Sequence, residues 1–118
     1  MNRAEVKRGE VWDINFDPQV GDEIAKVRPA VVLDVGSARL ELRIVVPLTG
    51  WRPEFAGNIS KIRTDLSAPS GLTKASAADA YQIKSVSIRR FVRKRGELPD
   101  ATVDDIAAAV AALIDVPF

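Results

Sequence analysis

The most informative stretch of the sequence is KVRPAVVL, which runs from Lys26 to Leu33. A cation lies directly before a proline, and the proline opens an apolar run that is too continuous for a half-exposed strand, so the pattern predicts a loop leading into a buried strand. Because Pro29 fixes its own φ and keeps Arg28 out of the helical region, the guanidinium would be held at the start of the strand with little backbone freedom. Such a rigid position is typical of a residue in a functional site. A solvated charge before an edge strand would give the same pattern.

The composition limits the chemistry that is available. The chain has 118 residues, enough for one domain with its own core, and it contains no cysteine and no histidine. These absences exclude thiol nucleophiles, histidine general bases, Ser/His triads and the usual zinc sites. The charged N-terminus has no apolar run behind it, and no segment reaches membrane-spanning length, so we expect a cytoplasmic protein without membrane contact.

The charges are unevenly distributed, although the formal net charge is only +1. Residues 84–95 contain six basic side chains and no acid, whereas every charged residue from 97 to 115 is acidic. This asymmetry favours an anionic partner near the basic segment, but such a run is also typical of a solvated face. The six cations are Lys84, Arg89, Arg90, Arg93, Lys94 and Arg95.

Several stretches predict short strands separated by turns. The stretch 10–16 alternates in polarity, and a long loop of the kind that often binds a ligand returns to the Pro29 strand, which would form a hairpin with residues 40–48. Thr49 follows this second hairpin strand, at its end. In the next loop Trp51 and Phe55 indicate either a partner surface or a lid over the core. Further strands are predicted over 58–63, 72–78, 81–86 and 91–97, and this spacing predicts a small β-barrel.

Near the C-terminus the spacing of apolar residues changes from that of a strand to that of a helix. Thr102 is suited to the N-cap of a helix, and acids follow in the first turn, where the helix dipole favours negative charge. Apolar residues then recur at helical spacing, and the opposite face is alanine, so we expect the helix to be covered by the barrel and also by a second surface. The sequence therefore predicts one domain over 1–118, with the barrel over about 6–97 and the helix over about 102–115.

Six short motifs occur in the order in which the MazF/PemK family of toxin endoribonucleases carries them. They are Arg8-Gly9-Glu10-Val11-Trp12 leading to Asp17-Pro18, the loop with Gly21 and Glu23, Arg28-Pro29 with its aliphatic strand, Val46-Pro47-Leu48-Thr49, Gly71-Leu72 with Ala75, and Gln82-Ile83-Lys84-Ser85-Val86. The chain resembles this family over almost its whole length. The resemblance implies a mainly β fold with a C-terminal α-helix, in the form of a small SH3-like β-barrel of the plasmid-maintenance-toxin (MazF/CcdB-like) type. It also implies a homodimer, a cognate antitoxin, a single-stranded RNA substrate cut at short motifs, and no metal or other cofactor.

The resemblance also assigns roles to residues. Arg28 matches the catalytic arginine of the family, and Thr49 matches the catalytic threonine or serine that follows the Pro-Leu pair. Many members carry an aspartate directly before the glutamine of the last motif, whereas this chain has Tyr81 there and Asp79 further upstream, which bears on base specificity. The residues expected to bind RNA are Glu23, Lys26, Gln82, Lys84 and Ser85.

RNA cleavage suits a chain without histidine, because the 2′-hydroxyl of the substrate can attack its own phosphate. A planar guanidinium at Arg28 would stabilise the charged phosphorane, and the hydroxyl of Thr49 could donate to a phosphoryl oxygen. The residues alone, without the resemblance, favour a β-branched strand end at Thr49 whose hydroxyl caps the turn. Two other functions fit the same fold: a toxin that poisons DNA gyrase through protein contacts, and a non-catalytic barrel that binds peptide or nucleic acid.

Overall fold

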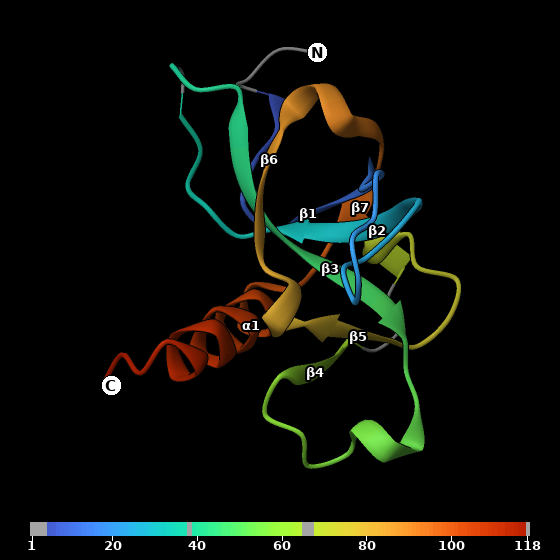
Figure 1. The fold of residues 1–118 in the computed structure, drawn as a ribbon, viewed down its shortest axis with the longest axis vertical. Helices are drawn as coiled ribbons and strands as arrows, with labels where there is room; N and C mark the ends of the chain where they lie inside the picture. Colours follow the sequence, from blue (N-terminus) through green and yellow to red (C-terminus); the bar gives the residue numbers. More distant parts are fainter. Residues whose placement is uncertain (1–4, 38, 65–67, 118) are drawn as a thin grey trace.

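The structure is a computed structural model that describes residues 5–37, 39–64 and 68–117 (Figure 1). The expected class is confirmed: the chain is mainly β, with one C-terminal α-helix. The strands are β1 (Glu10–Asn15), β2 (Val27–Val32), β3 (Leu42–Gly50), β4 (Lys61–Thr64), β5 (Ser76–Asp79), β6 (Lys84–Ser87) and β7 (Phe91–Glu97), and the helix is α1 (Asp100–Leu113). Short 3-10 turns include η2 (Pro53–Phe55), η3 (Ala68–Ser70), η4 (Ala80–Gln82) and η5 (Ile88–Arg90).

All the strand pairings are antiparallel, and they follow the path β4-β5-β3-β2-β1-β7, with β6 also paired to β3. The hairpin of β2 with β3 is the one that the sequence predicts. Strand β3 has three partners, because its first half also pairs with β6 and its last three residues pair with β5. Among the described strands no pairing joins the two ends of the path. The sheet is therefore not closed, and the expected barrel describes it only loosely.

Most of β1, the second half of β2 and residues 45–48 of β3 are buried on both faces. Val32 and Val45 belong to one core cluster, which includes Trp12 and Phe91, whereas their neighbours along the strands contribute to a second cluster that includes residues of α1. A strand covered on both faces has no outward polar positions, which explains the continuous apolar run after Pro29. The expectation of a buried strand is confirmed.

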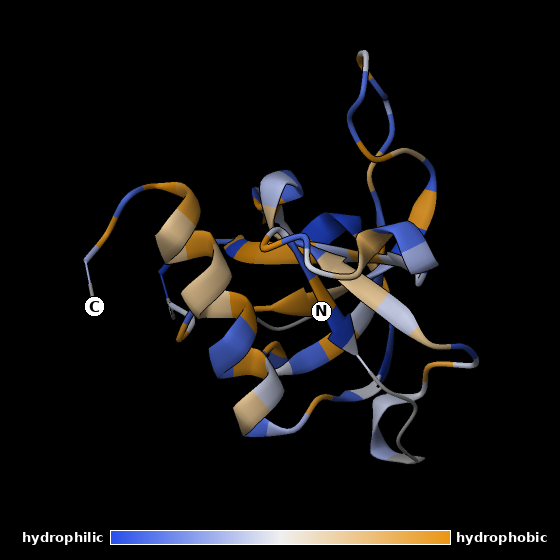
Figure 2. Cartoon of the chain, turned by 90° about the horizontal axis from the view of Figure 1, so that it is seen from below, coloured by the Kyte–Doolittle hydropathy of each residue, from blue (hydrophilic) through white to orange (hydrophobic). Residues whose placement is uncertain are grey.

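The helix begins two residues earlier than expected. Pro99 takes the N-cap position, and Asp100 is the acid of the first turn, so the expectation that Thr102 is the N-cap is wrong. Proline fixes φ near the value that precedes a helix, which allows the helix to start directly behind it. The helix buries Val103 and Ile106 in the second cluster. In Figure 2 it is coloured apolar along most of its length, with hydrophilic colour near its first turns.

Other boundaries also differ from the prediction. The expected strand over 81–86 is wrong at its start, because residues 80–82 form η4 and β6 begins only at Lys84. The strands expected over 58–63 and 72–78 are shorter, at 61–64 and 76–79. The turn expected between these two strands lies partly outside the described residues. No helix in the described part of the chain combines the length and apolar character needed to cross a bilayer.

Strand β3 carries a buried arginine. Arg43 is only 1% exposed, whereas the apolar neighbours Leu42 and Ile44 are 45% and 42% exposed. The guanidinium donates hydrogen bonds to the backbone carbonyl oxygens of Val6, Ser37, Leu40 and Leu42. A buried guanidinium requires such acceptors. The alternation in this part of β3 is therefore inverted, with the charged side chain inside and the apolar side chains outside.

Candidate active site

Arg28 and Thr49 lie on neighbouring strands and line the same cavity. Strand β2 carries Arg28 and β3 carries Thr49, and the last paired position of the two strands joins Ala30 to Pro47. Arg28 lies two residues beyond this pair on β2, and Thr49 lies two residues beyond it on β3, at the same end of the hairpin. Both residues line a cavity of about 700 Å³, whose wall also includes Ile24 and Trp51. The fold therefore brings together the two residues for which the sequence predicts catalysis.

The cavity is strongly cationic. Arg28, Arg52 and Lys74 line it, and no carboxylate is among the described residues of its wall. Within the described part of the chain, none of these three cations forms an ion pair. Because opposite charges attract strongly at short range and unpaired cations keep their donors available, the site is suited to an anion such as a phosphodiester.

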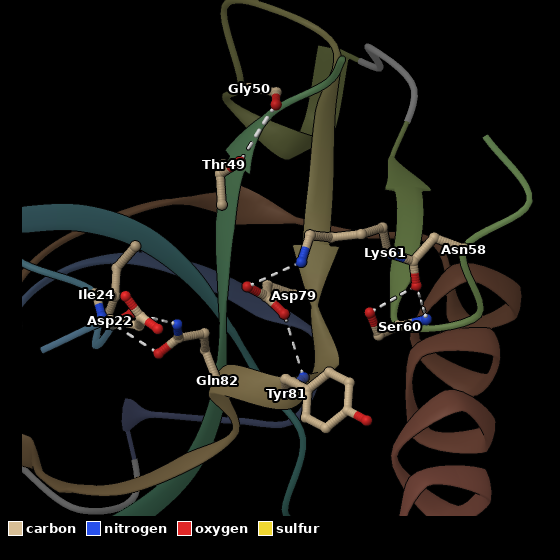
Figure 3. A network of polar contacts seen from close by, with 10 residues as sticks. All are labelled: Asp22, Ile24, Thr49, Gly50, Asn58, Ser60, Lys61, Asp79, Tyr81 and Gln82. Atoms are coloured by element: carbon tan, nitrogen blue, oxygen red, sulfur yellow. Dashed lines mark hydrogen bonds and ion pairs between the residues drawn. The ribbon is translucent and has the colours of Figure 1, made fainter. Parts of the chain in front are cut away.

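Thr49 is half-buried, and its hydroxyl has only a local partner. Its Oγ1 donates a hydrogen bond to the carbonyl oxygen of Gly50 at 3.2 Å (Figure 3). A hydroxyl can rotate to another acceptor, because its hydrogen is not fixed by the backbone. The arrangement is thus compatible with donation to a ligand in the cavity and also with the simple turn contact that the sequence left open.

A second, smaller cavity adjoins the first. Its volume is about 280 Å³, and Arg28, Pro29, Lys74 and Ser76 line both cavities. Its far end is formed in part by Asp13 and Arg95. The shared wall means that an extended chain could pass from one cavity to the other alongside Arg28 and Lys74.

Three of the expected RNA-binding residues meet in one polar network. Gln82 accepts a hydrogen bond from the backbone nitrogen of Ile24 at 3.2 Å and donates to the carbonyl oxygen of Asp22 at 2.8 Å (Figure 3). Lys84 forms an ion pair with Glu23 at 3.7 Å. The side chains of Gln82 and Lys84 thus hold the loop between β1 and β2, and Ile24 of this loop forms part of the larger cavity.

The other two expected RNA-binding residues lie elsewhere. None of the five expected RNA-binding residues is among the described residues that line the two cavities, and Lys26 and Ser85 also lie outside the polar network of Gln82. Lys26 has a positive φ of 62°, and its backbone nitrogen donates to the carboxylate of Asp17 at 2.7 Å. Ser85 lies on β6 opposite Ile44. Lys26 and Ser85 therefore do not share a cavity with Arg28 and Thr49.

Asp79 has a structural partner on each side. Its carboxylate forms an ion pair with Lys61 at 3.2 Å and accepts from the backbone nitrogen of Tyr81 at 3.2 Å, at the start of η4 (Figure 3). Tyr81 is 73% exposed. The tyrosine ring is thus presented to solvent.

Comparisons with known proteins agree with this geometry. Residues 7–114 match the family described as PemK-like, MazF-like toxin of type II toxin-antitoxin system. The chain belongs to this family. A curated relative, Endoribonuclease MazF9 of Mycobacterium tuberculosis strain H37Rv, is 31% identical over 122 residues, which cover 94% of this chain and 98% of the relative.

Solved structures of MazF proteins share the fold. MazF (Form-I) from Deinococcus radiodurans matches with a TM-score of 0.77 at 22% identity, covering 92% of this chain and 96% of that one. An endoribonuclease in complex with its cognate antitoxin, from Mycobacterial species, matches with a TM-score of 0.71 at 20% identity, covering 95% of this chain and 97% of the other. At these identities the likeness concerns the fold.

In this MazF-like toxin the basic segment is largely paired within the chain. Arg93 and Arg95 form ion pairs with Asp13, and Lys94 forms one with Glu10. Of the remaining cations in the run, Arg89 pairs with Glu41, Lys84 pairs with Glu23, and Arg90 donates to the carbonyl oxygens of Asn15 and Asp17. The charge asymmetry of the sequence therefore does not by itself mark a free cationic surface.

The ion pair between Glu10 and Lys94 shifts the pKa of both side chains. Burial raises the pKa of Glu10, but hydrogen bonds from Lys94, the backbone of Lys7 and the indole of Trp12 outweigh it, so the pKa lies below its ordinary value. The hydrogen bond with Glu10 is the main cause that raises the pKa of Lys94. Both shifts favour the charged forms, as expected for a hydrogen-bonded ion pair.

The two aromatic residues of the loop after β3 contact each other, and each also contacts a cation. Trp51 and Phe55 meet edge to face, with ring centroids 5.9 Å apart, which is within the range typical of such pairs. The guanidinium of Arg63 lies 5.1 Å from the centroid of Trp51, and Lys61 lies 5.3 Å from that of Phe55. Neither ring belongs to a core cluster. Trp51 instead faces the larger cavity.

Sequence reasoning missed two cavity residues, Arg52 and Lys74. Each lies just beyond a strand end, Arg52 after β3 and Lys74 before β5, and the backbone nitrogen of Trp51 donates to Ala75 between them. The pairing of β3 with β5 was the missing information, because it alone brings Lys74 next to Arg52. In the described residues, no group of three or more acidic side chains is placed to hold a metal ion.

Proposed function

We propose that this chain is a toxin endoribonuclease that cleaves single-stranded RNA in the larger cavity. The observation that carries the proposal is that Arg28 and Thr49 line one cavity together with two further cations and no described carboxylate. The curated relative MazF9 is named an endoribonuclease, and it aligns with nearly the whole chain. Family membership makes the chain one half of a toxin–antitoxin pair.

In the proposed reaction the substrate supplies the nucleophile. The 2′-oxygen of the ribose forms a bond to the adjacent phosphorus, and the bond from phosphorus to the 5′-oxygen breaks. The proton of the 2′-hydroxyl passes to a solvent base, and the 5′-oxygen takes up a proton as it leaves. The products are a 2′,3′-cyclic phosphate and a 5′-hydroxyl. No metal takes part in this scheme, because charge stabilisation comes from the side chains.

Arg28 is suited to charge stabilisation rather than to proton abstraction. A guanidinium stays protonated in proteins, so it is a poor base, but its fixed fork of donors matches two phosphoryl oxygens. We assign it this role first and donation to the leaving 5′-oxygen second. Thr49 would donate to another phosphoryl oxygen once its hydroxyl turns away from Gly50. Such a donor contributes about a hundredfold to a thousandfold in rate.

The remaining cavity residues would bind the rest of the RNA. Arg52 is placed to contact a backbone phosphate, and Trp51 offers a ring on which a splayed base can stack. We also assign RNA contacts to the loop network, in which RNA would replace the contacts that the loop now makes. The residues proposed for this role are Glu23, Gln82 and Lys84, followed by Lys26 and Ser85 at the edge of the site.

Cleavage of a long single-stranded RNA in excess EDTA tests the proposal. We expect the purified protein to give discrete cuts at one short motif, with 5′-hydroxyl and cyclic phosphate ends. Arg28→Ala and Thr49→Ala should each lose about a hundredfold or more in rate. Arg89→Ala is the matched control, because Arg89 is exposed, pairs with Glu41 at the surface and is not among the described residues that line either cavity. RNA that stays intact with the folded protein would overturn the proposal and leave a gyrase assay as the next step.

We further propose that the toxin acts in the cytoplasm as a homodimer that an antitoxin inhibits. Leu42 and Ile44 are exposed on one face of β3, and a second copy could cover them. The antitoxin is expected to be acidic and partly disordered, so that its carboxylates reach the unpaired cations of the cavity. Sedimentation of the protein beside Ile44→Lys tests the dimer: a change from dimer to monomer is expected, and a wild-type monomer would contradict it.

A further inference from the structure

We propose that Lys74 is a third catalytic residue, whose ammonium group donates to a non-bridging oxygen of the scissile phosphate. This inference rests on the proposed ribonuclease function and extends it to a residue outside the set that the family resemblance assigns. Three observations carry it: the place of Lys74 in the backbone, the position of its ammonium nitrogen, and the absence of an ion-pair partner among the described residues.

The backbone fixes Lys74 beside the strand that carries Thr49. In the pairing of β3 with β5, Thr49 lies opposite Ala77 and Gly50 lies opposite Ser76. The hydrogen bond from the nitrogen of Trp51 to the carbonyl oxygen of Ala75, at 3.0 Å, continues this ladder. The Oγ of Ser76 donates to the carbonyl oxygen of Lys74, also at 3.0 Å. Lys74 is thus attached to the cavity wall through its main chain.

The side chain of Lys74 reaches back over Gly50. A Cβ atom added to Gly50 would lie 3.3 Å from the Nζ of Lys74 and 3.5 Å from its Cε. The ammonium group therefore occupies the space above the residue that directly follows Thr49. Lys74 also lines both cavities, as Arg28 does. A phosphate that contacts Arg28 and Thr49 would lie within reach of this ammonium group.

The donors of Lys74 are available to a ligand. In the described residues the ammonium group forms no ion pair and no hydrogen bond to a side chain, so its three donors can serve a phosphate. The phosphorane carries two negative charges on its non-bridging oxygens, and the leaving oxygen also requires a proton donor. If Lys74 binds one non-bridging oxygen, Arg28 can donate to the other and to the leaving group. A point charge on a flexible stem complements the planar fork of the arginine.

Single-turnover kinetics test the role. At saturating RNA, we expect Lys74→Met to lower the cleavage rate constant roughly a hundredfold, while affinity for an uncleavable RNA with a 2′-deoxy group at the cut changes by less than about threefold. Lys74→Arg should recover part of the rate. Lys7→Met is the matched control, because Lys7 is exposed and lines neither cavity. Circular dichroism and thermal unfolding show whether each variant is folded.

Sulfur substitution provides a readout that a merely structural role would not change. Sulfur accepts hydrogen bonds poorly, so one phosphorothioate diastereomer at the cut should slow the wild-type protein, and this slowing should be much smaller in Lys74→Met. An unchanged rate in Lys74→Met, a loss of affinity alone, or an unchanged thio effect would overturn the inference while the ribonuclease proposal stands. If the wild-type protein cleaves no RNA, the function fails, and the inference fails with it.

Discussion

Glu10 is a buried carboxylate whose charge the fold stabilises. Its pKa is lowered and that of Lys94 is raised, so the pair contributes stability above the ordinary pKa of glutamate and below that of lysine. The contribution of Glu10 disappears as the pH falls through its lowered pKa. We expect Glu10→Gln to be less stable than the wild type at neutral pH by about 1–3 kcal/mol. Urea unfolding at a series of pH values should show the difference shrinking as the pH falls below the ordinary pKa of glutamate, and a constant difference would contradict the assignment.

Arg43 is also buried and charged, but unlike Glu10 its charge is bound by neutral carbonyl oxygens. Replacing it with methionine would leave those acceptors without a donor. We expect Arg43→Met to lower the free energy of unfolding by about 2 kcal/mol or more, because each buried acceptor left unsatisfied costs about 1–3 kcal/mol. Arg89→Met, at an exposed ion pair, should change it by less than about 1 kcal/mol. Equal effects of the two substitutions on urea unfolding would show that burial of Arg43 is unimportant.

Gln82 is one of the side chains from other elements that hold the loop between β1 and β2. Gln82 binds the backbone at Asp22 and Ile24, so Gln82→Ala should release this wall of the cavity. We expect the amide of Ile24 to exchange with solvent about fivefold faster or more, which corresponds to the loss of one net hydrogen bond of about 1 kcal/mol. Ser85→Ala, on the following strand, is the control. Unchanged exchange in Gln82→Ala would mean that other contacts hold the loop.

We expect the cations of β7 and those of the cavity to contribute differently to RNA binding. The cations of β7 are paired with Asp13 and Glu10, whereas Arg52 is unpaired in the described structure. We expect Arg52→Met to reduce the slope of log affinity against log salt by about 1, as for the loss of one phosphate contact, and Arg93→Met to leave it nearly unchanged. Titrations of an uncleavable RNA at several salt concentrations measure both slopes. A larger change of slope for Arg93→Met than for Arg52→Met would show that the cations of β7 bind RNA.

Over the whole molecule, the sequence predicted what depends on residues that are close along the chain and missed what depends on contacts between distant segments. Pro29 and the valines behind it predicted a buried strand, because burial on both faces leaves a continuous apolar run. The inverted face at Arg43 could not be predicted, since alternation does not say which side faces the core. The partners of Arg93 come from β1, and the neighbours of Lys74 come from β3, at separations that no local pattern encodes.

The connection that leads to Lys74 is packed tightly against β7. A Cβ added at Gly96 would overlap the carbonyl oxygen of Pro69, and one added at Gly71 would overlap that of Arg95. The guanidinium of Arg95 donates twice to the carbonyl oxygen of Gly71, at 3.2 and 3.0 Å. The conformational entropy of this segment is therefore lost during folding and not when a ligand arrives. This wall of the cavity is therefore preorganised, and the free energy of RNA contacts with it is retained as affinity.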